Sequence, residues 1–213
     1  MTELPGNDLA LIDAGGANLG SVRYALGRIG ASPRLVRDAD ELGEPARIIL
    51  PGVGAAAPSM ALLRARGLDV ALRASEVPLL GVCVGMQLLF ESSEEGDVDC
   101  LGLLKGRVRK LSGGPGLRVP HMGWNRLQKR VDANGDTSPL LKGIDDGAHA
   151  YFVHSYAVLV DDDTSGCVLA DSDHGQRFAA VVGSGKRYGA QFHPERSSAA
   201  GLQLLDNFLK LPS

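Results

Sequence analysis

The chain has 213 residues, enough for a single domain over residues 1–213, and contains 28 glycines but only 5% aromatic residues. Hydrophobic residues make up 44% and charged residues 22%, which is typical of a globular protein and excludes a disordered chain. The net charge of −3 excludes the basic surface that nucleic acid or an anionic membrane would require.

The first half of the chain alternates between apolar runs and segments with helical periodicity. Strands are predicted at residues 9–13, 34–37, 47–50 and 78–83, and helices at residues 18–29, 59–72 and 84–90. The predicted strands are apolar throughout, which is typical of a parallel sheet covered on both faces. The sequence therefore predicts an α/β fold with a three-layer open sheet that is mainly parallel.

The second half has strands separated by turns of Gly, Asp and Ser. These strands are predicted at residues 108–111, 124–127, 151–160, 166–170, 178–182 and 188–192. They indicate that this half is largely antiparallel or mixed, which would give the sheet an antiparallel part. An amphipathic helix over residues 198–209 closes the chain. No linker separates the two halves, so we expect them to share one core.

The cysteines and the N-terminal sequence indicate the cellular compartment of the protein. Cys83, Cys100 and Cys167 cannot all pair with one another and lack zinc-site spacing, so we expect neither a disulfide framework nor a metal. No nucleotide fingerprint is present, so we expect no cofactor. No signal peptide is visible, and the longest apolar run, residues 78–84, is too short to span a bilayer. We therefore expect a cytoplasmic protein without a membrane or nucleic-acid partner.

The sharpest motif is Gly81-Val-Cys83-Val-Gly85, where an apolar run passes directly into a helical segment. This pattern is typical of a nucleophile elbow, in which a tight strand-to-helix turn exposes the nucleophile. The N-terminus of the following helix would favour the reactive thiolate of Cys83. Taken alone, a cysteine at the end of a strand is equally typical of a buried structural residue.

A nucleophile needs a base, and His193 is the best candidate among five histidines. It follows the strand predicted at residues 188–192, and Pro194 separates it from Glu195. The rigid proline would allow Glu195 to orient the imidazole, as the acid of a triad does. A lone H-P-E is more typical of a surface turn, but this one lies 110 residues after Cys83 and its elbow.

Acyl transfer also needs backbone N–H donors for the oxyanion. The residue after the nucleophile, Val84, would supply one of them. The segment Pro51-Gly52-Val53-Gly54 directly follows a predicted strand and would supply another. Taken alone, this segment is more typical of a plain turn.

In this order and spacing, the segments P-G-V-G, G-V-C-V-G-M-Q-L-L-F-E and H-P-E resemble the class I, triad-type glutamine amidotransferases. The resemblance covers nearly the whole chain and implies the fold of that family. It implies that Cys83 attacks the side-chain carboxamide of glutamine. It also implies that His193 shuttles protons, that Glu195 orients His193, and that a glutamyl thioester forms.

The same resemblance implies a binding pocket for glutamine. Gln87 and Glu95 would hold the head groups of the substrate. The backbone of His154, Ser155 and Tyr156 would line the same pocket.

Within the family, further segments resemble the glutaminase subunits of imidazole glycerol phosphate synthases. They are P-H-M-G-W-N at residues 120–125, Y-F-V-H-S-Y at 151–156, Q-F-H-P-E-R-S-S at 191–198 and L-G-L-L-K-G at 101–106. The resemblance implies a heterodimer with a (β/α)₈-barrel cyclase subunit. Ammonia would pass to that subunit, which makes imidazole glycerol phosphate and aminoimidazole carboxamide ribotide in histidine biosynthesis. From its length, we expect this chain to hold no second, ammonia-accepting domain.

The resemblance also implies a partner interface, formed by Asn18, Met122, Trp124, Asn125 and Arg196. Trp124 is the only tryptophan, and tryptophan is enriched at interface hot spots. From sequence alone, a core position for Trp124 is equally compatible.

Some positions depart from the family or have no role in it. Ala14 and Ala17 stand where these subunits usually have Tyr and Gly. We expect His121 to line the interface, and His149 and His174 to lie in solvated turns. Two other functions stay open. One is the same fold serving an anthranilate, aminodeoxychorismate or pyridoxal phosphate synthase; the other is a non-catalytic relative.

Overall fold

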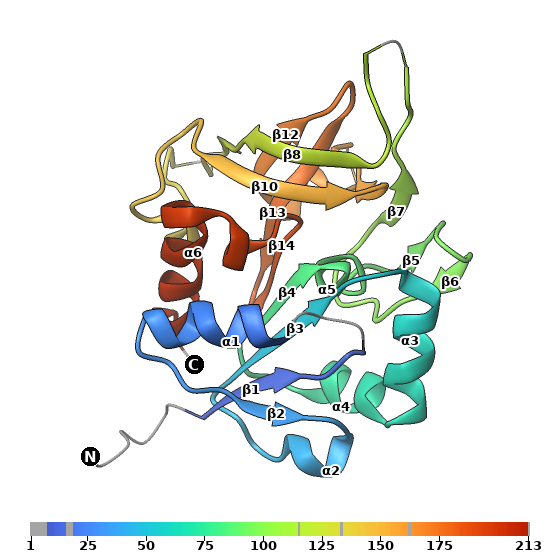
Figure 1. Ribbon diagram of the computed structural model, residues 1–213, viewed down its shortest axis with the longest axis vertical. Coiled ribbons are helices and arrows are strands. Elements are labelled where there is room, and N and C mark those ends of the chain that lie inside the picture. Colours follow the sequence, from blue (N-terminus) through green and yellow to red (C-terminus); the bar gives the residue numbers. More distant parts are fainter. Residues whose placement is uncertain (1–7, 16–18, 115, 133, 162, 213) are drawn as a thin grey trace.

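An eight-stranded sheet forms the centre of the molecule, in the order β2-β1-β3-β4-β14-β13-β12-β9 (Figure 1). The computed structural model describes residues 8–15, 19–114, 116–132, 134–161 and 163–212. The strands are β1 (Leu9–Ile12), β2 (Arg34–Val36), β3 (Arg47–Gly52), β4 (Leu79–Cys83), β9 (Gln128–Lys129), β12 (Val168–Asp173), β13 (Arg177–Ser184) and β14 (Arg187–Ala190). Neighbours from β2 to β14 are parallel and those from β14 to β9 antiparallel, which confirms the predicted sheet.

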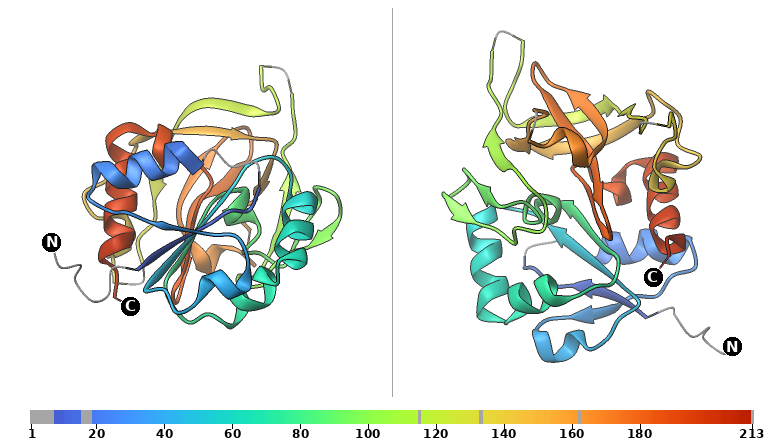
Figure 2. Two further views of the ribbon diagram at one scale, coloured as in Figure 1. Left: turned by 60° about the horizontal axis from the view of Figure 1, so that its bottom comes forward. Right: turned by 180° about the vertical axis from the view of Figure 1, so that it is seen from behind.

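Helices cover both faces of this sheet. Helices α1 (Leu19–Arg28) and α6 (Ser198–Lys210) lie on one face, and α3 (Ala56–Ala65) and α4 (Leu68–Ala74) on the other (Figures 1 and 2). The short α2 (Ala39–Leu42) follows β2. The buried apolar side chains of both halves form one cluster. Within the described ranges, no helix is long and apolar enough to cross a bilayer.

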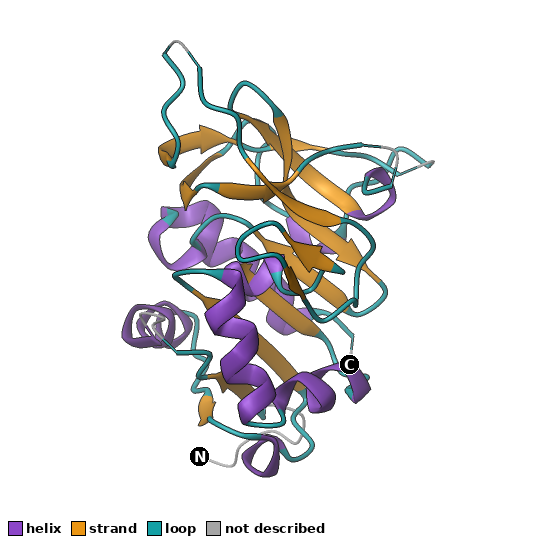
Figure 3. Cartoon of the chain, turned by 90° about the vertical axis from the view of Figure 1, so that its right-hand side faces the viewer, coloured by secondary structure: helices purple, strands orange, loops and turns teal. Residues whose placement is uncertain are grey.

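The described residues also form two smaller sheets beside the central one, and Figure 3 shows the strands of the chain in orange. One pairs β8 (His121–Arg126) with β10 (His149–His154). The other contains β11 (Tyr156–Val158), β7 (Arg107–Lys110), β5 (Ser92–Ser93) and β6 (Val98–Asp99). The chain passes from the first small sheet to the second at Ser155, between β10 and β11. The single strand predicted at residues 151–160 is therefore two strands.

Two predicted helices also differ from the structure. The helix expected at residues 59–72 is broken into α3 and α4 at Gly67, whose φ of 66° is a left-handed conformation that ends α-helices. The helix expected at residues 84–90 is only α5 (Val84–Gln87). It ends there because the carbonyls of Leu88 and Phe90 accept hydrogen bonds from the loop at residues 101–102.

Candidate active site

Cys83 lies at the turn between β4 and α5, with φ 54° and ψ −113°. A non-glycine residue rarely has a positive φ, and such strain is typical of a nucleophile elbow. The strained turn fits tightly against β3. A Cβ atom added to Gly85 would lie 1.8 Å from the carbonyl oxygen of Leu50, so only glycine fits there. The predicted elbow is therefore present in the fold, held by contact between backbones.

His193 follows β14 and is held by its backbone. Its N–H donates to the carbonyl of Tyr151 at 3.0 Å, and its carbonyl accepts from the hydroxyl of Ser197 at 2.7 Å. Its Nδ1 lies 2.9 Å from Oε1 of Glu195. Because a carboxylate only accepts, Nδ1 carries a proton and Nε2 is left for the reaction. The structure thus joins the base and acid that the sequence predicted.

The pKa of His193 is the balance of opposing effects. Burial alone lowers it, but hydrogen bonds and charge interactions with Cys83 and Glu195 raise the pKa to about 10. An imidazolium is therefore stable at neutral pH when it faces both groups. Such a neighbouring cation is what stabilises a reactive thiolate.

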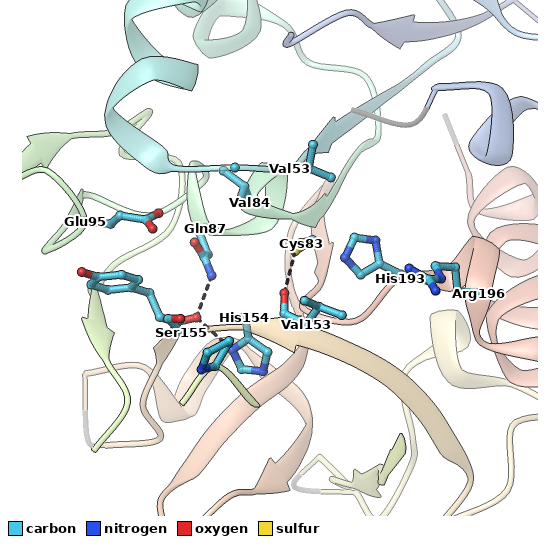
Figure 4. A pocket seen from close by; sticks show the side chains of 13 residues that line it. Val53, Cys83, Val84, Gln87, Glu95, Val153, His154, Ser155, His193 and Arg196 are labelled. Carbon is cyan, nitrogen blue, oxygen red and sulfur yellow. Dashed lines mark hydrogen bonds between the residues drawn. The ribbon is translucent and has the colours of Figure 1, made fainter. Parts of the chain in front are cut away.

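A pocket of about 350 Å³ opens in front of Cys83 and His193 (Figure 4). Val53 and Val84, predicted for the oxyanion hole, line it, and so do the predicted substrate-binding residues Gln87, Glu95, His154, Ser155 and Tyr156. Arg196, predicted for the partner interface, also lines this pocket. Gly52 and Glu195 do not line it: Gly52 pairs with Cys83 in the sheet, and Glu195 lies behind His193.

Gly54, Pro120 and Val153 also line the pocket. Pro120 and Val153 lie within segments that carry the family resemblance, which was the available signal for both.

Gln87 and Glu95 lie on the same side of the pocket, and each is fixed by a hydrogen bond (Figure 4). Nε2 of Gln87 donates to the carbonyl of Tyr156 at 2.8 Å and to Oε1 of Gln191 at 3.0 Å. Oε2 of Glu95 accepts from the N–H of Ala56, at the start of α3, at 2.9 Å. Gln191, whose role the sequence did not reveal, is fully buried next to the motif H-P-E.

Only some of the predicted interface residues lie together on one exposed surface. Met122 is 64% and Trp124 53% exposed on β8, which excludes a core position for the tryptophan. The guanidinium of Arg196 lies 4.5 Å from the ring centre of Tyr151, whose edge contacts Trp124. Asn125 instead donates to the backbone carbonyl of Asp173.

Other predicted positions lie elsewhere or outside the described residues. Asn18 and Ala17 lie outside the described residues, while Ala14 is buried. His121, expected at the interface, is only 5% exposed because its ring packs against those of Phe152 and Phe178. His174, expected in solvent, stacks on the ring of His121. Among the described residues, no group of three or more His, Cys, Asp or Glu side chains is placed to hold a metal ion.

Comparison with known proteins agrees with this fold. The family model "Glutamine amidotransferase class-I" matches residues 10–211. A crystal structure of a glutamine amidotransferase has a TM-score of 0.71 at 22% identity, covering 95% of this chain and 97% of that one. The crystal structure of a glutamine amidotransferase from Thermotoga maritima has a TM-score of 0.59 at 18% identity, covering 88% and 76%. The fold is that of the class I glutamine amidotransferases.

Curated relatives show which subfamily of the class I glutamine amidotransferases this chain resembles. Imidazole glycerol phosphate synthase subunit HisH of Xanthomonas campestris pv. campestris (strain 8004) is 59% identical, covering 96% of this chain and 98% of that protein. Subunit HisH of Xylella fastidiosa (strain Temecula1) is equally similar over the same shares. The chain therefore belongs to the class I glutamine amidotransferase family and, within it, to the HisH subunits. These relatives do not favour the other synthases considered above.

Proposed function

We propose that this chain is the glutaminase subunit of an imidazole glycerol phosphate synthase. It hydrolyses glutamine to glutamate and delivers ammonia to a (β/α)₈-barrel cyclase subunit. The cyclase then makes imidazole glycerol phosphate and aminoimidazole carboxamide ribotide for histidine biosynthesis. The observation that carries the proposal is the pocket in which Cys83 faces His193 while Glu195 holds the far side of the imidazole.

In the first half of the reaction, the thiolate of Cys83 attacks the carboxamide carbon of glutamine. The N–H of Val84 and an amide of the Gly52–Val53 loop stabilise the oxyanion. The C–N bond then breaks, and the imidazolium of His193 transfers its Nε2 proton to the departing nitrogen. Ammonia leaves, and a glutamyl thioester remains on Cys83.

In the second half, neutral His193 takes a proton from water while the water oxygen attacks the thioester. The C–S bond breaks, which restores the thiolate of Cys83 and the imidazolium of His193. The new carboxyl group ionises as glutamate leaves. Glu195 stays bonded to Nδ1 throughout and keeps Nε2 directed at the reacting atoms.

The walls of the pocket supply the binding of glutamine. Gln87 and Glu95 offer acceptor oxygens to the α-ammonium group, and the backbone of residues 154–156 lines the side opposite α5. A pocket of about 350 Å³ matches the lower end of the size range for small-molecule sites.

The proposal includes a partner, a location and a domain. The exposed side chains of Met122, Trp124 and Arg196 would contact the cyclase, because large apolar residues and arginine are enriched at interfaces. Asn18 and Asn125 belong to the same proposed interface. A cytoplasmic location fits an enzyme that needs a reduced thiol. Residues 1–213 would form a single domain, supported by one core and a family model over residues 10–211.

The test is glutamine hydrolysis by the complex with the cyclase. We expect Cys83→Ala to lower the rate at least about 10⁴-fold, because the nucleophile is lost, without changing the affinity for the cyclase. Cys167→Ala is the matched control, since that thiol bonds only to the carbonyl of Thr164 among the contacts described. Substantial turnover by Cys83→Ala would contradict the assigned nucleophile.

A further inference from the structure

Three histidines outside the triad pack together behind one wall of the pocket. The ring of His121 stacks on that of His174, with centroids 4.2 Å apart, and meets the edge of His154 at 5.1 Å. His121 and His154 are only 5% and 6% exposed, between the rings of Phe152 and Phe178. Polar rings in apolar surroundings are costly unless each nitrogen is hydrogen-bonded, so their bonding pattern is informative.

The hydrogen bonds run in one direction. The carbonyl of Tyr156 can only accept, so His154 carries its proton on Nδ1, 2.9 Å away. Nε2 of the neutral His154 then accepts from Nδ1 of His121, at 3.0 Å. Nε2 of His121 in turn lies 3.3 Å from the amide nitrogen of Asn125, whose oxygen accepts from the N–H of Arg126. Each ring is therefore restricted to one tautomer.

Burial keeps both rings uncharged. It lowers the pKa of His154 to about 3. The hydrogen bond to the carbonyl of Tyr156 opposes this shift, and smaller charge interactions with His121, His174 and His193 add to it. It lowers the pKa of His121 to about 4, and the charge of His174 adds to the shift. The directional chain of bonds is thus intact at neutral pH.

The chain of bonds ends at the pocket. In the pairing of β11 with β7, the N–H of Leu111 donates to the carbonyl of Ser155. Carbonyls alternate along a strand, so that of Tyr156 faces the opposite way. There it accepts from both His154 and Nε2 of Gln87. Because Gln191 accepts from the same Nε2, the amide oxygen of Gln87 is left for a ligand.

We propose that His154, supported by His121, is a positioning residue that holds the carbonyl of Tyr156 toward Gln87, so that the amide oxygen of Gln87 faces the substrate. This inference rests on the proposed function. With Nε2 held by Tyr156, Gln87 presents an acceptor beside the carboxylate of Glu95. Two acceptors suit the α-ammonium group of glutamine, whereas a reversed amide would direct N–H groups at that cation. Loss of His154 should therefore weaken glutamine binding more than it slows the chemistry.

The experiment uses the complex with the cyclase and three variants. His154→Phe keeps the ring but removes the donor, His154→Asn keeps a donor near the position of Nδ1, and His149→Phe changes an exposed histidine as the control. We measure KM and kcat for glutamine. We also measure the glutamine concentration that half-protects Cys83 from iodoacetamide.

For His154→Phe we expect KM and the half-protecting concentration to rise about tenfold, the effect of one lost hydrogen bond to a binding group. We expect kcat, and the alkylation rate without glutamine, to change less than about threefold. His154→Asn should recover most of the affinity, and His149→Phe should match the unmodified complex.

Unchanged glutamine affinity in His154→Phe would overturn the inference. The inference would also be overturned if kcat and the alkylation rate of His154→Phe fell together, because such a result indicates a general distortion of the active site. If His154→Phe fails to fold, His121→Phe replaces it: it keeps the stacking, leaves Nε2 of His154 without its donor and should raise KM by a smaller factor. No rise in that variant would overturn the inference. Failure of the proposed function looks different, since the unmodified complex would then neither hydrolyse glutamine nor be protected by it.

Discussion

The two sides of the pocket are built by different means. On the side of β4, backbone fits against backbone: Gly85 lies against Leu50 so closely that no Cβ fits between them. On the side of β8 and β10, side chains hold one another: Glu195 bonds to His193, and His154 bonds to His121. The nucleophile is thus placed by steric fit, whereas the base and the binding wall are placed by hydrogen bonds.

This difference has a consequence for mutation. An extra atom on the β4 side must displace a backbone, and the fold itself is affected. A lost hydrogen bond on the other side leaves the backbone in place and alters protonation or binding. Variants on the two sides should therefore differ in kind: loss of stability on the first, and altered kinetics with a stable fold on the second.

The largest effect is expected from Gly85→Ala. Its Cβ would lie 1.8 Å from the carbonyl oxygen of Leu50, so β3 and β4 must separate. We expect the free energy of unfolding to fall by at least about 3 kcal/mol, measured by urea denaturation.

Gly27→Ala is the matched control for this variant. A Cβ at Gly27, on α1, meets no atom within 4 Å. Alanine favours the helix, so we expect a gain of roughly 0.5–1 kcal/mol there. Equal stability of the two variants would show that steric fit does not place the elbow.

The next effect tests the hydrogen-bonded side. In Glu195→Gln, the amide cannot keep Nδ1 of His193 protonated as the carboxylate does, and the charge that raises the pKa of His193 is lost. We expect kcat for glutamine hydrolysis to fall about 10²–10⁴-fold, the range for a general acid–base residue. The unfolding free energy should change far less than in Gly85→Ala.

Glu41→Gln makes the same chemical change on α2, where the carboxylate accepts from the N–H of Arg37. We expect its kcat to stay at the level of the unmodified complex. A fall in kcat as large as that of Glu195→Gln would show that the loss is not specific to the triad.

The sequence could predict the β4 side better than the other side, for a physical reason. On the β4 side, the elbow and the P-G-V-G loop are short segments whose geometry depends on adjacent residues. On the other side, only H-P-E is of this kind. The contacts of His154 with His121 join residues 33 positions apart, and those of Gln87 with Gln191 join residues 104 apart. They depend on the passage of the chain between two sheets at Ser155, which periodicity did not show. His121 and His174 were misplaced for the same reason.

The last effect, and the smallest when taken per pH unit, is the part of the pH dependence of stability that the two buried histidines of the hydrogen-bonded side contribute. The pKa values of His121 and His154 are lowered to about 4 and 3, whereas histidines of the unfolded chain titrate near 6.5. Between these values the unfolded state binds more protons, so stability falls as the pH decreases from about 6.5 toward 4. His193 adds little below about pH 6, because its raised pKa keeps it protonated in the folded state and its ordinary pKa near 6.5 keeps it protonated in the unfolded state.

Each buried histidine should contribute up to about 1.4 kcal/mol per pH unit to this slope. We would measure urea denaturation at several pH values between 4.5 and 7, a range set by the direction of the pKa shifts. The double variant with His121→Phe and His154→Phe keeps the rings and should flatten the slope, while His149→Phe should retain it. Since carboxylates titrate in all three proteins alike, only the difference between slopes reports on the two histidines. An equal slope in the double variant would mean that these rings are not held neutral, and that the wall is not positioned by their tautomers.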